Sequence, residues 1–557
     1  MIENRAGLGT AQTTIFGSAF TGCRPHSTRD RTARNSRQSC AVSIVRRAAH
    51  VDPYAAQHAL APDAAPLRFA AQVKRKPLGR FLPQGGLEMA TLTTLLWDVT
   101  RKCNLSCIHC FNTDKYRGAL GTKRQDLTTQ QAIEAISKIA DVGFRHLHLL
   151  GGEPLARTDL TKIIAQARNK GLRVTINSNG TLLDERKANE LIDLGVEQFT
   201  VSLDGATPEV NDLIRGKGSF ARATSNLRML VNLIHRRNGA MQTAIAFTLT
   251  KLNLHQLEQM LALCSEIGVT GIDFMELYVS GEAHKNQSLL KYSLQEGIDS
   301  LERLVGKYIA HYPNLSVQFD SYTSLVFYLN RKYQADIIMN PRNMACRAAD
   351  ESWLMEADGL LNPCGVCNST LYNREPLADG RYCLEMYYVT EVPSLDIVAN
   401  STYFQSFLRF RNDPEFYAKF VTCRKCAHHA YCRPCPFIHY KDVIIPECEE
   451  VHRRIQRFEN EVLSLSPRLS RDVVWQESNG QVKVWDALNK EFRELEGFGS
   501  EIWHLIKDNE GTTADDLLEM AWQQAKQRYA QLPSKRQFRR EFIDFVWALR
   551  RSGWLAV

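Results

Sequence analysis

Three cysteines stand close together in the first half of the chain, with the spacing C-x3-C-x2-C: Cys103, Cys107 and Cys110. Three thiolates on one loop can hold three irons of a four-iron cluster, which leaves the fourth iron open to a substrate or cosubstrate. A structural metal site fills its coordination instead. The lack of a nearby fourth ligand therefore points to catalysis. A zinc site with a remote ligand and a set of three structural thiols are the alternatives.

A second group of cysteines lies between residues 346 and 448. It includes two pairs, Cys423-x2-Cys426 and Cys432-x2-Cys435. Paired C-x2-C units commonly bind zinc, so zinc on these four residues is one interpretation. The chain has 557 residues and 15 cysteines, which does not fit a small, secreted disulfide scaffold. Clustered thiols in such a chain indicate metal or redox chemistry in a reducing compartment, and we expect a cytoplasmic protein.

Strand-like and helix-like segments alternate from about residue 93 onward. The strand-like runs are residues 94–99, 146–150, 173–177, 198–203, 243–249 and 271–277. This alternation predicts an α/β fold made of βαβ units with a parallel sheet. Six repeats fit a partial (β/α)6 TIM barrel better than a closed barrel of eight. The strand ends, where such folds place their sites, carry the polar motifs described next.

The cysteine loop and four later segments resemble the radical S-adenosylmethionine (SAM) superfamily. The family's loop is C-x3-C-x-Φ-C with an aromatic residue at Φ, where this chain has His109. The other segments resemble the family's G-G-E-P, S/T-N-G, S-x-D-G and H-D-x-x-R-G motifs, in the same order. They are Gly151-Gly152-Glu153-Pro154, Ser178-Asn179-Gly180, Ser202-Leu203-Asp204-Gly205, and residues 211–216, which include Arg215 and have Asn211 in place of the family's His.

The resemblance implies that Cys103, Cys107 and Cys110 hold a 4Fe-4S cluster that binds SAM. It implies that the G-G-E-P stretch binds the amino group of the methionine moiety, that Ser202 contacts the ribose hydroxyls, and that Arg215 pairs with the SAM carboxylate. Asn211 is given no role, and no catalytic acid or base is assigned. The full set of implied SAM-site residues is His109, Gly151, Gly152, Glu153, Pro154, Ser178, Asn179, Ser202, Asp204 and Arg215.

The later cysteines resemble the SPASM extension of radical SAM enzymes that modify peptides and proteins. The spacing matches except that the last spacer, before Cys435, has two residues rather than three. The resemblance implies two auxiliary 4Fe-4S clusters. Cys423, Cys426, Cys432 and Cys448 would hold one of them. The other would be held by Cys346, Cys364 and Cys435, with Cys383, Cys367 or an open site as the fourth ligand.

Residues 466–557 predict a separate βββααα domain, in which Asn479-Gly480 marks a type I′ hairpin. This pattern resembles the small PqqD-like peptide-recognition domain, which binds a leader peptide as an added strand. A winged-helix DNA-binding module is the alternative, with phosphate contacts from arginines that a solvated helix face explains equally well. The aromatic residues of the domain are either core residues or peptide pockets, with core favoured: Trp475, Trp485, Phe492 and Trp503.

The net charge of +8 comes from the N-terminal residues. Residues 1–80 hold 13 Lys and Arg against four Asp and Glu, so the remainder is nearly neutral and gives no indication of nucleic-acid binding. This tail resembles a transit peptide, although a solvated tail or an upstream start codon explains it as well. No apolar run is long enough to span a membrane. The predicted segments are a disordered basic tail (1–85), a radical SAM partial barrel (86–290), a helical connector (291–345), a SPASM domain (346–455) and a PqqD-like domain (466–557).

The resemblance implies an enzyme that modifies a ribosomally made precursor peptide. A 5′-deoxyadenosyl radical would abstract a hydrogen, and oxidative cross-linking would form a C–C, C–S or C–O bond, with a flavodoxin or ferredoxin as electron donor. The precursor's leader would bind the C-terminal domain. One alternative is a sulfatase-type maturase that forms formylglycine and does not need residues 466–557. The other is a metal-bearing winged-helix regulator that binds DNA.

Overall fold

The structure is a computed structural model in which most of the chain after residue 92 is described. The described residues are 93–112, 124–320, 323–335, 337–339, 348–364, 385–420, 426, 444–486, 490–496 and 498–556, together with the backbone of the short strand β1 (Ala70–Ala71). Nine of the candidate metal ligands named above are cysteines of the second group, and of these only Cys364, Cys426 and Cys448 lie within these ranges.

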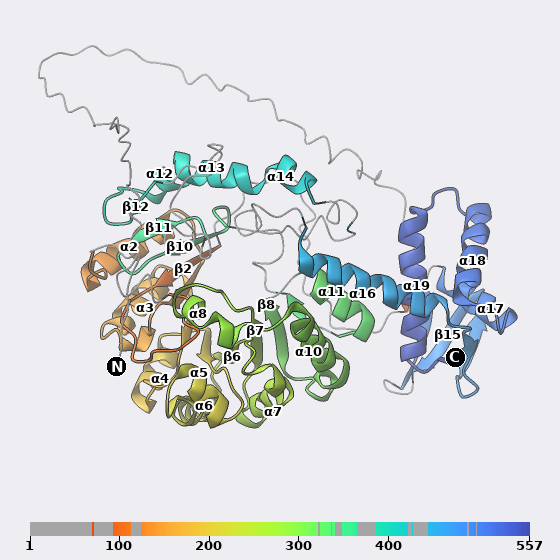
Figure 1. Ribbon diagram of the computed structural model, residues 1–557, viewed down its shortest axis with the longest axis horizontal. Helices are drawn as coiled ribbons and strands as arrows, with labels where there is room; N and C mark the ends of the chain where they lie inside the picture. Colours follow the sequence, from red (N-terminus) through yellow and green to blue (C-terminus); the bar gives the residue numbers. More distant parts are fainter. Residues whose placement is uncertain are drawn as a thin grey trace, which may run out of the picture. The chain divides into compact units, whose positions relative to one another are not determined.

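An 11-stranded sheet forms the centre of the fold (Figure 1). Its strands β2 to β9 are parallel neighbours in chain order, and β10 pairs in parallel with β2 at the other side. The six strands expected from the sequence, β2 to β7, are confirmed within two residues at each end. The parallel strands are β2 (Thr94–Asp98), β3 (His146–Leu150), β4 (Arg173–Ser178), β5 (Gln198–Ser202), β6 (Gln242–Thr248), β7 (Gly271–Met275), β8 (Ser316–Asp320), β9 (Ile338–Met339) and β10 (Ser352–Met355).

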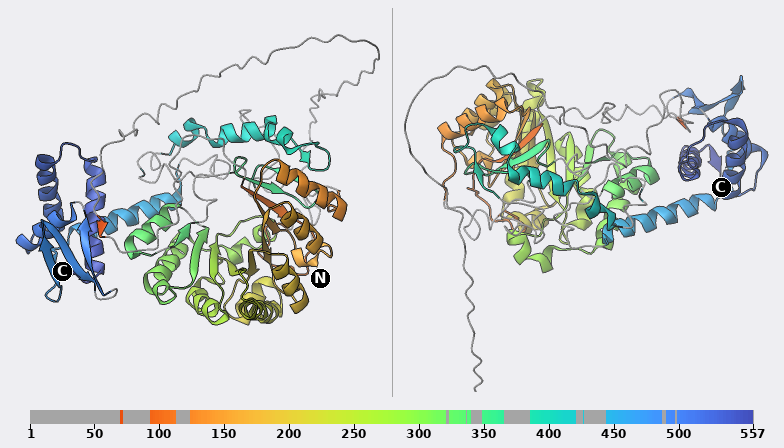
Figure 2. Two further views of the ribbon diagram at one scale, coloured as in Figure 1. Left: turned by 180° about the vertical axis from the view of Figure 1, so that it is seen from behind. Right: turned by 90° about the horizontal axis from the view of Figure 1, so that it is seen from above.

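Helices cover the outer face of this sheet (Figures 1 and 2). Alternate residues of each strand pack against them: Leu147 and Leu149 of β3 are fully buried, as are Phe247 of β6 and Phe274 of β7. The period of two follows from the strand backbone, whose side chains point to opposite faces in turn. The helices are α2 (Thr129–Asp141), α3 (Leu160–Asn169), α4 (Glu185–Asp193), α5 (Pro208–Arg215), α6 (Ser219–Arg236), α7 (Leu257–Ile267), α8 (Gly281–Lys285), α9 (Gln287–Leu290), α10 (Leu294–Lys307) and α11 (Thr323–Tyr333), with the 3₁₀ turns η2 (Pro154–Ala156), η3 (Leu254–Gln256) and η4 (Ile309–His311).

The inner face of the sheet is polar. His146 and His148 of β3 alternate with the buried leucines, and both imidazoles contact the hydroxyl of Thr175 on β4, at 2.8 and 2.6 Å. On β7 and β8, the Gln318 amide donates to Asp273. A sheet that is apolar on one face and polar on the other encloses a hydrophilic interior, which suits a ligand-binding lumen better than a packed core.

Residues 291–345 differ from the predicted helical connector, because they contain β8, which extends the parallel sheet beyond β7. Its five residues, Ser316–Asp320, lie between α10 and α11, and two of them, Val317 and Phe319, are buried against the helices. The residues of β8 alternate between polar and apolar, a strand signal that the interpretation of this region as helical overlooked.

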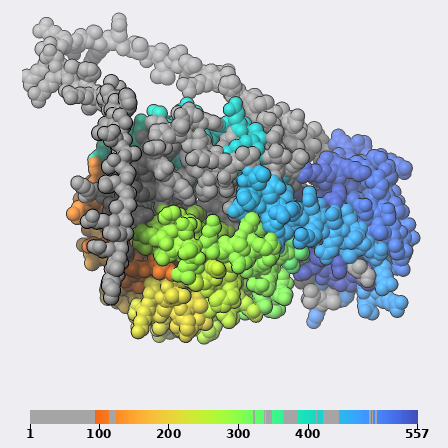
Figure 3. All heavy atoms as spheres, in the orientation of Figure 1, coloured from red at the N-terminus to blue at the C-terminus, as the bar shows by residue number. Residues whose placement is uncertain are grey.

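The sheet ends in antiparallel strands, after which helices lead toward the C-terminal domain. Strand β11 (Leu360–Asn362) pairs with β10, and β12 (Tyr387–Tyr388) pairs with β11. The short helices α12 (Leu395–Ala399), α13 (Thr402–Arg411) and α14 (Pro414–Ala418) follow. The long helix α16 (Pro446–Leu463) then packs against α11 (Figure 1). Figure 3 shows the light-blue atoms of this part of the chain next to green atoms of the barrel.

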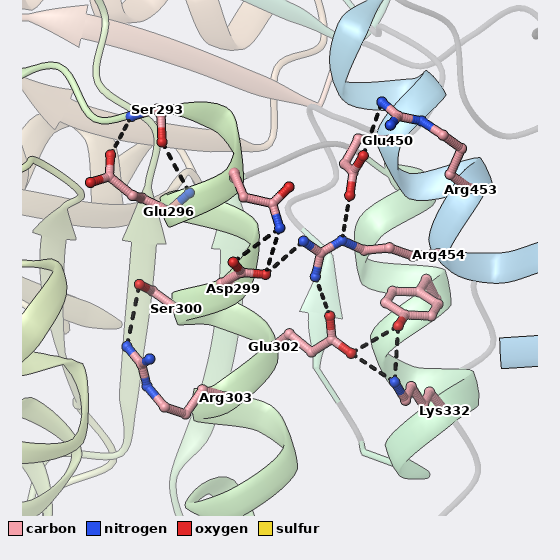
Figure 4. A network of polar contacts seen from close by, with 12 residues as sticks. Ser293, Glu296, Asp299, Ser300, Glu302, Arg303, Lys332, Glu450, Arg453 and Arg454 are labelled. Carbon is pink, nitrogen blue, oxygen red and sulfur yellow. Dashed lines mark hydrogen bonds and ion pairs between the residues drawn. The ribbon is translucent and has the colours of Figure 1, made fainter. Parts of the chain in front are cut away.

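A network of ion pairs fastens α16 to the barrel (Figure 4). The guanidinium of Arg454, on α16, pairs with Glu302 at 2.5 Å and Asp299 at 2.6 Å, both on α10, and with Glu450 at 2.9 Å. Glu302 also accepts a hydrogen bond from Lys332 of α11. Burial opposes ionisation of Glu302, but its cationic and hydroxyl partners lower its pKa to about 2. Three helices are thus joined through one carboxylate.

The C-terminal domain has the predicted βββααα order. Asn479 and Gly480 have φ values of 54° and 75°, and Ser478 pairs with Gln481, so the type I′ hairpin is confirmed. Trp503 is fully buried and stacks edge-on against Trp475, which places both in or beside the core, whereas Phe492 is exposed beside Trp485. The elements are β14 (Trp475–Ser478), β15 (Gln481–Asp486), β16 (Glu491–Glu496), α17 (Gly499–Asp508), α18 (Ala514–Arg528) and α19 (Lys535–Arg551), with a small second sheet of β13 (Arg468–Leu469) and β17 (Leu555–Ala556).

Candidate active site

The cysteine loop leaves the carboxyl end of β2 and is held there by the loop after β3. Gly152 N–H donates to the Thr100 carbonyl at 2.8 Å, and Glu153 N–H donates to that of Lys102 at 2.7 Å. A Cβ on Gly151 would lie 2.6 Å from the Thr100 oxygen, and one on Gly152 would lie 2.3 Å from the Lys102 oxygen. Both glycines therefore allow two backbone segments to meet, a role that the sequence analysis did not assign to them.

Two further elements anchor the middle of the cysteine loop. Ile108 N–H donates to the Ile214 carbonyl at the end of α5. On the other side, Glu282 N–H donates to the carbonyl of Cys110, and the Asn286 side chain donates to that of Ile108. The three cysteines therefore lie on a loop that contacts β3, α5 and α8, rather than on a free surface turn.

The end of β4 meets the cysteine loop through a buried carboxylate and two amides. Glu153 is completely buried and accepts hydrogen bonds from the Ser178 hydroxyl and the Asn179 N–H, both at 2.7 Å. Burial raises the pKa of Glu153, although these donors act in the opposite direction. Asn179 in turn donates to Asn104 in the cysteine loop, and Asn104 donates to Thr181. Pro154 follows as the first residue of η2.

A charged cluster beneath the loop joins three of the predicted residues. The Asp204 carboxylate is fully buried and lies 3.0 Å from His109 Nε2 and 2.5 Å from Arg215 Nε. Burial alone would raise the pKa of Asp204, but Arg215 and His109 together hold it well below its usual range. In this structure Arg215 is therefore the partner of Asp204. Ser202, two residues earlier, ends β5 and is half-buried.

Asn211 has a clear structural role that sequence reasoning missed. Its side-chain oxygen accepts from the Asp204 N–H at 2.9 Å, and its amide donates to Ser219. A Cβ on Gly205 would lie 2.4 Å from the Asn211 nitrogen, so the turn after β5 packs directly onto α5. The only sequence signal was the position itself, inside the motif that also supplies Arg215.

The donor set of the cysteine loop fits a metal cluster. Cys103 is exposed, and Cys107 and Cys110 are half-buried. Burial raises the pKa of Cys103, and it raises that of Cys107 to about 12 in spite of Arg215. A bound metal cation would stabilise the thiolate form of these cysteines near neutral pH. Among the described residues no three His, Cys, Asp or Glu side chains already form a metal-binding group, so the assignment rests on donor chemistry and loop position.

Comparison with known proteins agrees with this geometry. Residues 97–264, from β2 to α7, match the Radical SAM superfamily. Residues 97–264 form a radical SAM domain. All three loop cysteines and the Glu153 and Asp204 clusters lie inside it.

Curated relatives match only part of this chain. The chain is 33% identical to the Fe-coproporphyrin III synthase of Methanosarcina barkeri over 37% of this chain and 49% of that protein. It is 30% identical to the mycofactocin maturase MftC of Mycolicibacterium smegmatis (35% and 47%) and 29% identical to the PqqA peptide cyclase of Rhizobium meliloti (40% and 57%). The chain thus spans about half the length of the curated relatives it matches.

Solved structures give a more distant similarity. Streptococcus suis SuiB bound to the precursor peptide SuiA matches with a TM-score of 0.48 and 16% identity, over 64% of this chain and 74% of that chain. The structure described as native anSMEcpe with bound AdoMet matches with a TM-score of 0.48 and 14% identity, over 66% and 97%.

Two of the auxiliary-cluster candidates lie near each other beyond the radical SAM domain. Cys448 is buried in the first turn of α16, and its carbonyl accepts from His452 Nδ1 at 2.7 Å. The same imidazole hydrogen-bonds the side chain of Cys426, which raises the pKa of His452. Cys364 follows β11 and is half-buried. The remaining candidates fall outside the described residues: Cys346, Cys367, Cys383, Cys423, Cys432 and Cys435.

The arginines of α19 contact the protein itself. Arg539 pairs with Glu459 of α16 at 2.6 Å, Arg550 stacks over the ring of Trp547, and Arg551 donates to the Tyr333 carbonyl. Each of these three arginines therefore has a partner within the protein, so their presence on α19 does not require a phosphate group to bind there. Across the described part of the chain, no helix combines the length and apolarity needed to cross a membrane.

Proposed function

We propose that this chain is a radical SAM enzyme that modifies a ribosomally made precursor peptide by hydrogen abstraction and oxidative cross-linking. The relatives of its radical SAM domain include proteins named for porphyrin substrates as well as for peptides, so the domain match does not choose the substrate. The observation that carries the proposal lies in the C-terminal domain. The edge of β16 pairs with an extended segment, β1, which is how sheets bind peptides.

The residues of the cysteine loop would hold the reactive cofactors. Cys103, Cys107 and Cys110 would ligate a 4Fe-4S cluster, and SAM would bind beside it near His109, Glu153, Asn179 and Arg215. When bound, this pair supplies a 5′-deoxyadenosyl radical that abstracts hydrogen from the substrate. The protein's part is to hold the loop rigid through Gly151, Gly152 and Asn104 and to keep one buried cation, Arg215, beside the thiolates.

Two auxiliary 4Fe-4S clusters would carry electrons away from the substrate, since forming a cross-link removes two electrons. The contact of His452 with both Cys426 and Cys448 supports their place in one cluster. A flavodoxin or ferredoxin would supply the electron that starts the reaction. Such clusters require a reducing environment, which fits a cytoplasmic enzyme.

Anaerobic reconstitution tests the cofactor content. Three 4Fe-4S clusters correspond to about 12 iron atoms per chain. A triple C103A/C107A/C110A variant should lose about a third of them and should no longer release 5′-deoxyadenosine from SAM when reduced. A colourless zinc protein would contradict the proposal, as would a triple variant that still cleaves SAM.

Substrate identity is tested by co-expression with the short open reading frames next to the gene. The expected product is a peptide lighter by the mass of two hydrogen atoms for each cross-link, seen by mass spectrometry. Formylglycine at a Cys or Ser would identify a sulfatase-type maturase instead. Conversion of Fe-coproporphyrin III, or specific binding of duplex DNA with no peptide product, would reject the peptide substrate.

A further inference from the structure

The outer edge of the C-terminal sheet is occupied by the protein's own N-terminal region. The strand order of this sheet is β1-β16-β15-β14, and β1 is antiparallel to β16, with Ala70 opposite Glu496 and Ala71 opposite Leu495. Strand β1 also contacts α19. Figure 2 shows this short orange-red strand beside the blue C-terminal domain. The paired residues are more than 420 positions apart in the sequence, so this is a long-range contact.

The position that β1 occupies lies beside both β16 and α19. Leu495 is buried, and a Cβ on Gly499 would lie 3.4 Å from Leu495 Cβ and 3.0 Å from the Phe545 ring of α19. A segment paired with Leu495 therefore lies along both a strand edge and a helix. The edge supplies backbone donors and acceptors, and the helix supplies an apolar wall, which together form a site for an extended peptide.

The sequence around β1 is apolar and basic. Apolar residues stand at positions 67, 69, 70, 71 and 73. Basic residues stand at positions 68, 74, 75 and 76. Strand β16 carries Glu491, Glu494 and Glu496, while its one cation, Arg493, is paired with Asp486 at 2.6 Å. The sequence on either side of β1 is thus basic, and that of β16 is acidic, so the two are complementary in charge.

We propose that the N-terminal segment containing Ala70–Ala71 is a built-in competitor for the peptide-binding edge of β16. The inference rests on the proposed function, because it names the regulation of the edge that would bind the leader. A tethered segment meets its site at an effective concentration in the millimolar range for a short flexible tether. A leader peptide therefore has to displace it, and only leaders that bind more tightly than this segment gain access.

The test uses the full chain and a fluorescein-labelled synthetic peptide of residues 64–78 as probe. The A70P/A71P variant removes both backbone N–H donors of β1, so the edge becomes free. Fluorescence anisotropy should show the probe binding this variant at least tenfold more tightly than the wild-type chain. The matched A70S/A71S variant keeps both donors and should behave like wild type. A probe carrying the same two prolines should not bind.

Hydrogen exchange gives an independent measurement on the same proteins. The amides of residues 494–496 should lose protection in A70P/A71P and keep it in A70S/A71S. Equal probe affinity for wild type and A70P/A71P, or no binding to A70P/A71P, would overturn the inference. Neither assay contains SAM, a cluster or a precursor, so a failure of the proposed peptide chemistry would not affect the result. Conversely, detection of a cross-linked product would not bear on this inference, which the anisotropy and hydrogen-exchange measurements alone decide.

Discussion

Gly152 shows how the candidate site depends on residues that carry no chemistry. Its backbone N–H holds the cysteine loop, and its missing side chain allows the Lys102 carbonyl to approach. The resemblance to known motifs predicted that these glycines bind a ligand. The geometry assigns them a second role, which is to fix the loop that carries the three thiols.

Substituting Gly152 with alanine should therefore disturb the cysteine loop. The added Cβ would meet backbone atoms that cannot rotate away, and we expect a cost of about 1–3 kcal/mol in unfolding free energy. The iron content after anaerobic reconstitution should fall by about four atoms per chain, which is the content of one 4Fe-4S cluster. The matched control is G239A, whose Cβ would make only ordinary contacts of 3.5 Å or more. Full iron content in G152A would show that the loop has room to shift.

Asp204 is the second residue whose role became clear from its surroundings. It is the common partner of His109 and Arg215. Its backbone N–H donates to the Asn211 side chain, and its carboxylate accepts from the backbone N–H of Thr248 at the end of β6. The D204N substitution keeps the shape but leaves Arg215 buried without a counter-charge. We expect a loss of about 3–5 kcal/mol in unfolding free energy, measured by denaturant titration.

An exposed aspartate provides the control for D204N. Asp184 caps α4, and asparagine caps helices as well as aspartate does, so D184N should change the unfolding free energy by less than about 0.5 kcal/mol. If D204N were equally mild, Arg215 would have another compensating partner, and the buried pair would not support the cysteine loop.

Arg454 fastens helix α16 to the barrel through three carboxylate partners. Arg454 is nearly buried, and its removal would leave Glu302 and Glu450 close together without their shared cation. The R454M variant should lose about 3 kcal/mol or more in unfolding free energy at neutral pH. R186M is the control, because Arg186 forms an exposed pair within α4 that contributes under about 0.5 kcal/mol.

The pH dependence of this difference distinguishes charge from packing. The pKa of Glu302 is depressed to about 2 in the folded protein, so its stabilising contribution is present above its ordinary pKa and is lost as the pH falls toward 2. R454M removes part of that depression. The stability difference between wild type and R454M should therefore shrink as the pH falls below about 4.5. A difference that stays constant with pH would mean that lost packing dominates.

At the scale of the whole molecule, the proposal predicts a division of labour between the radical SAM domain and the C-terminal sheet. If the sheet tethers a leader, removing the leader from the identified precursor should raise KM by about 100-fold and leave kcat nearly unchanged. Steady-state kinetics with full-length and leaderless precursor measures both constants. Equal KM values would show that the substrate is recognised at the barrel alone.

The βαβ order, the strand positions and the grouping of polar motifs at strand ends were predictable from sequence, because local periodicity and local turn chemistry determine them. The hairpin at Asn479-Gly480 belongs to the same class, since two positive φ angles are a property of those residues themselves. The place of β8 in the sheet was not predictable, because it depends on pairing with β7, although its five residues alternate between polar and apolar.

The sequence by itself determined which residues are able to do chemistry: three thiols, a glutamate and an aspartate that follow strand ends, and an arginine further along the chain. Only the tertiary structure decided their partners. That Arg215 pairs with Asp204, that Gly152 supports the cysteine loop, and that Ala70–Ala71 lies on β16 are contacts between segments far apart in the chain. Such contacts depend on how sheets and helices pack in space, and one sequence without its fold does not encode them in any local pattern.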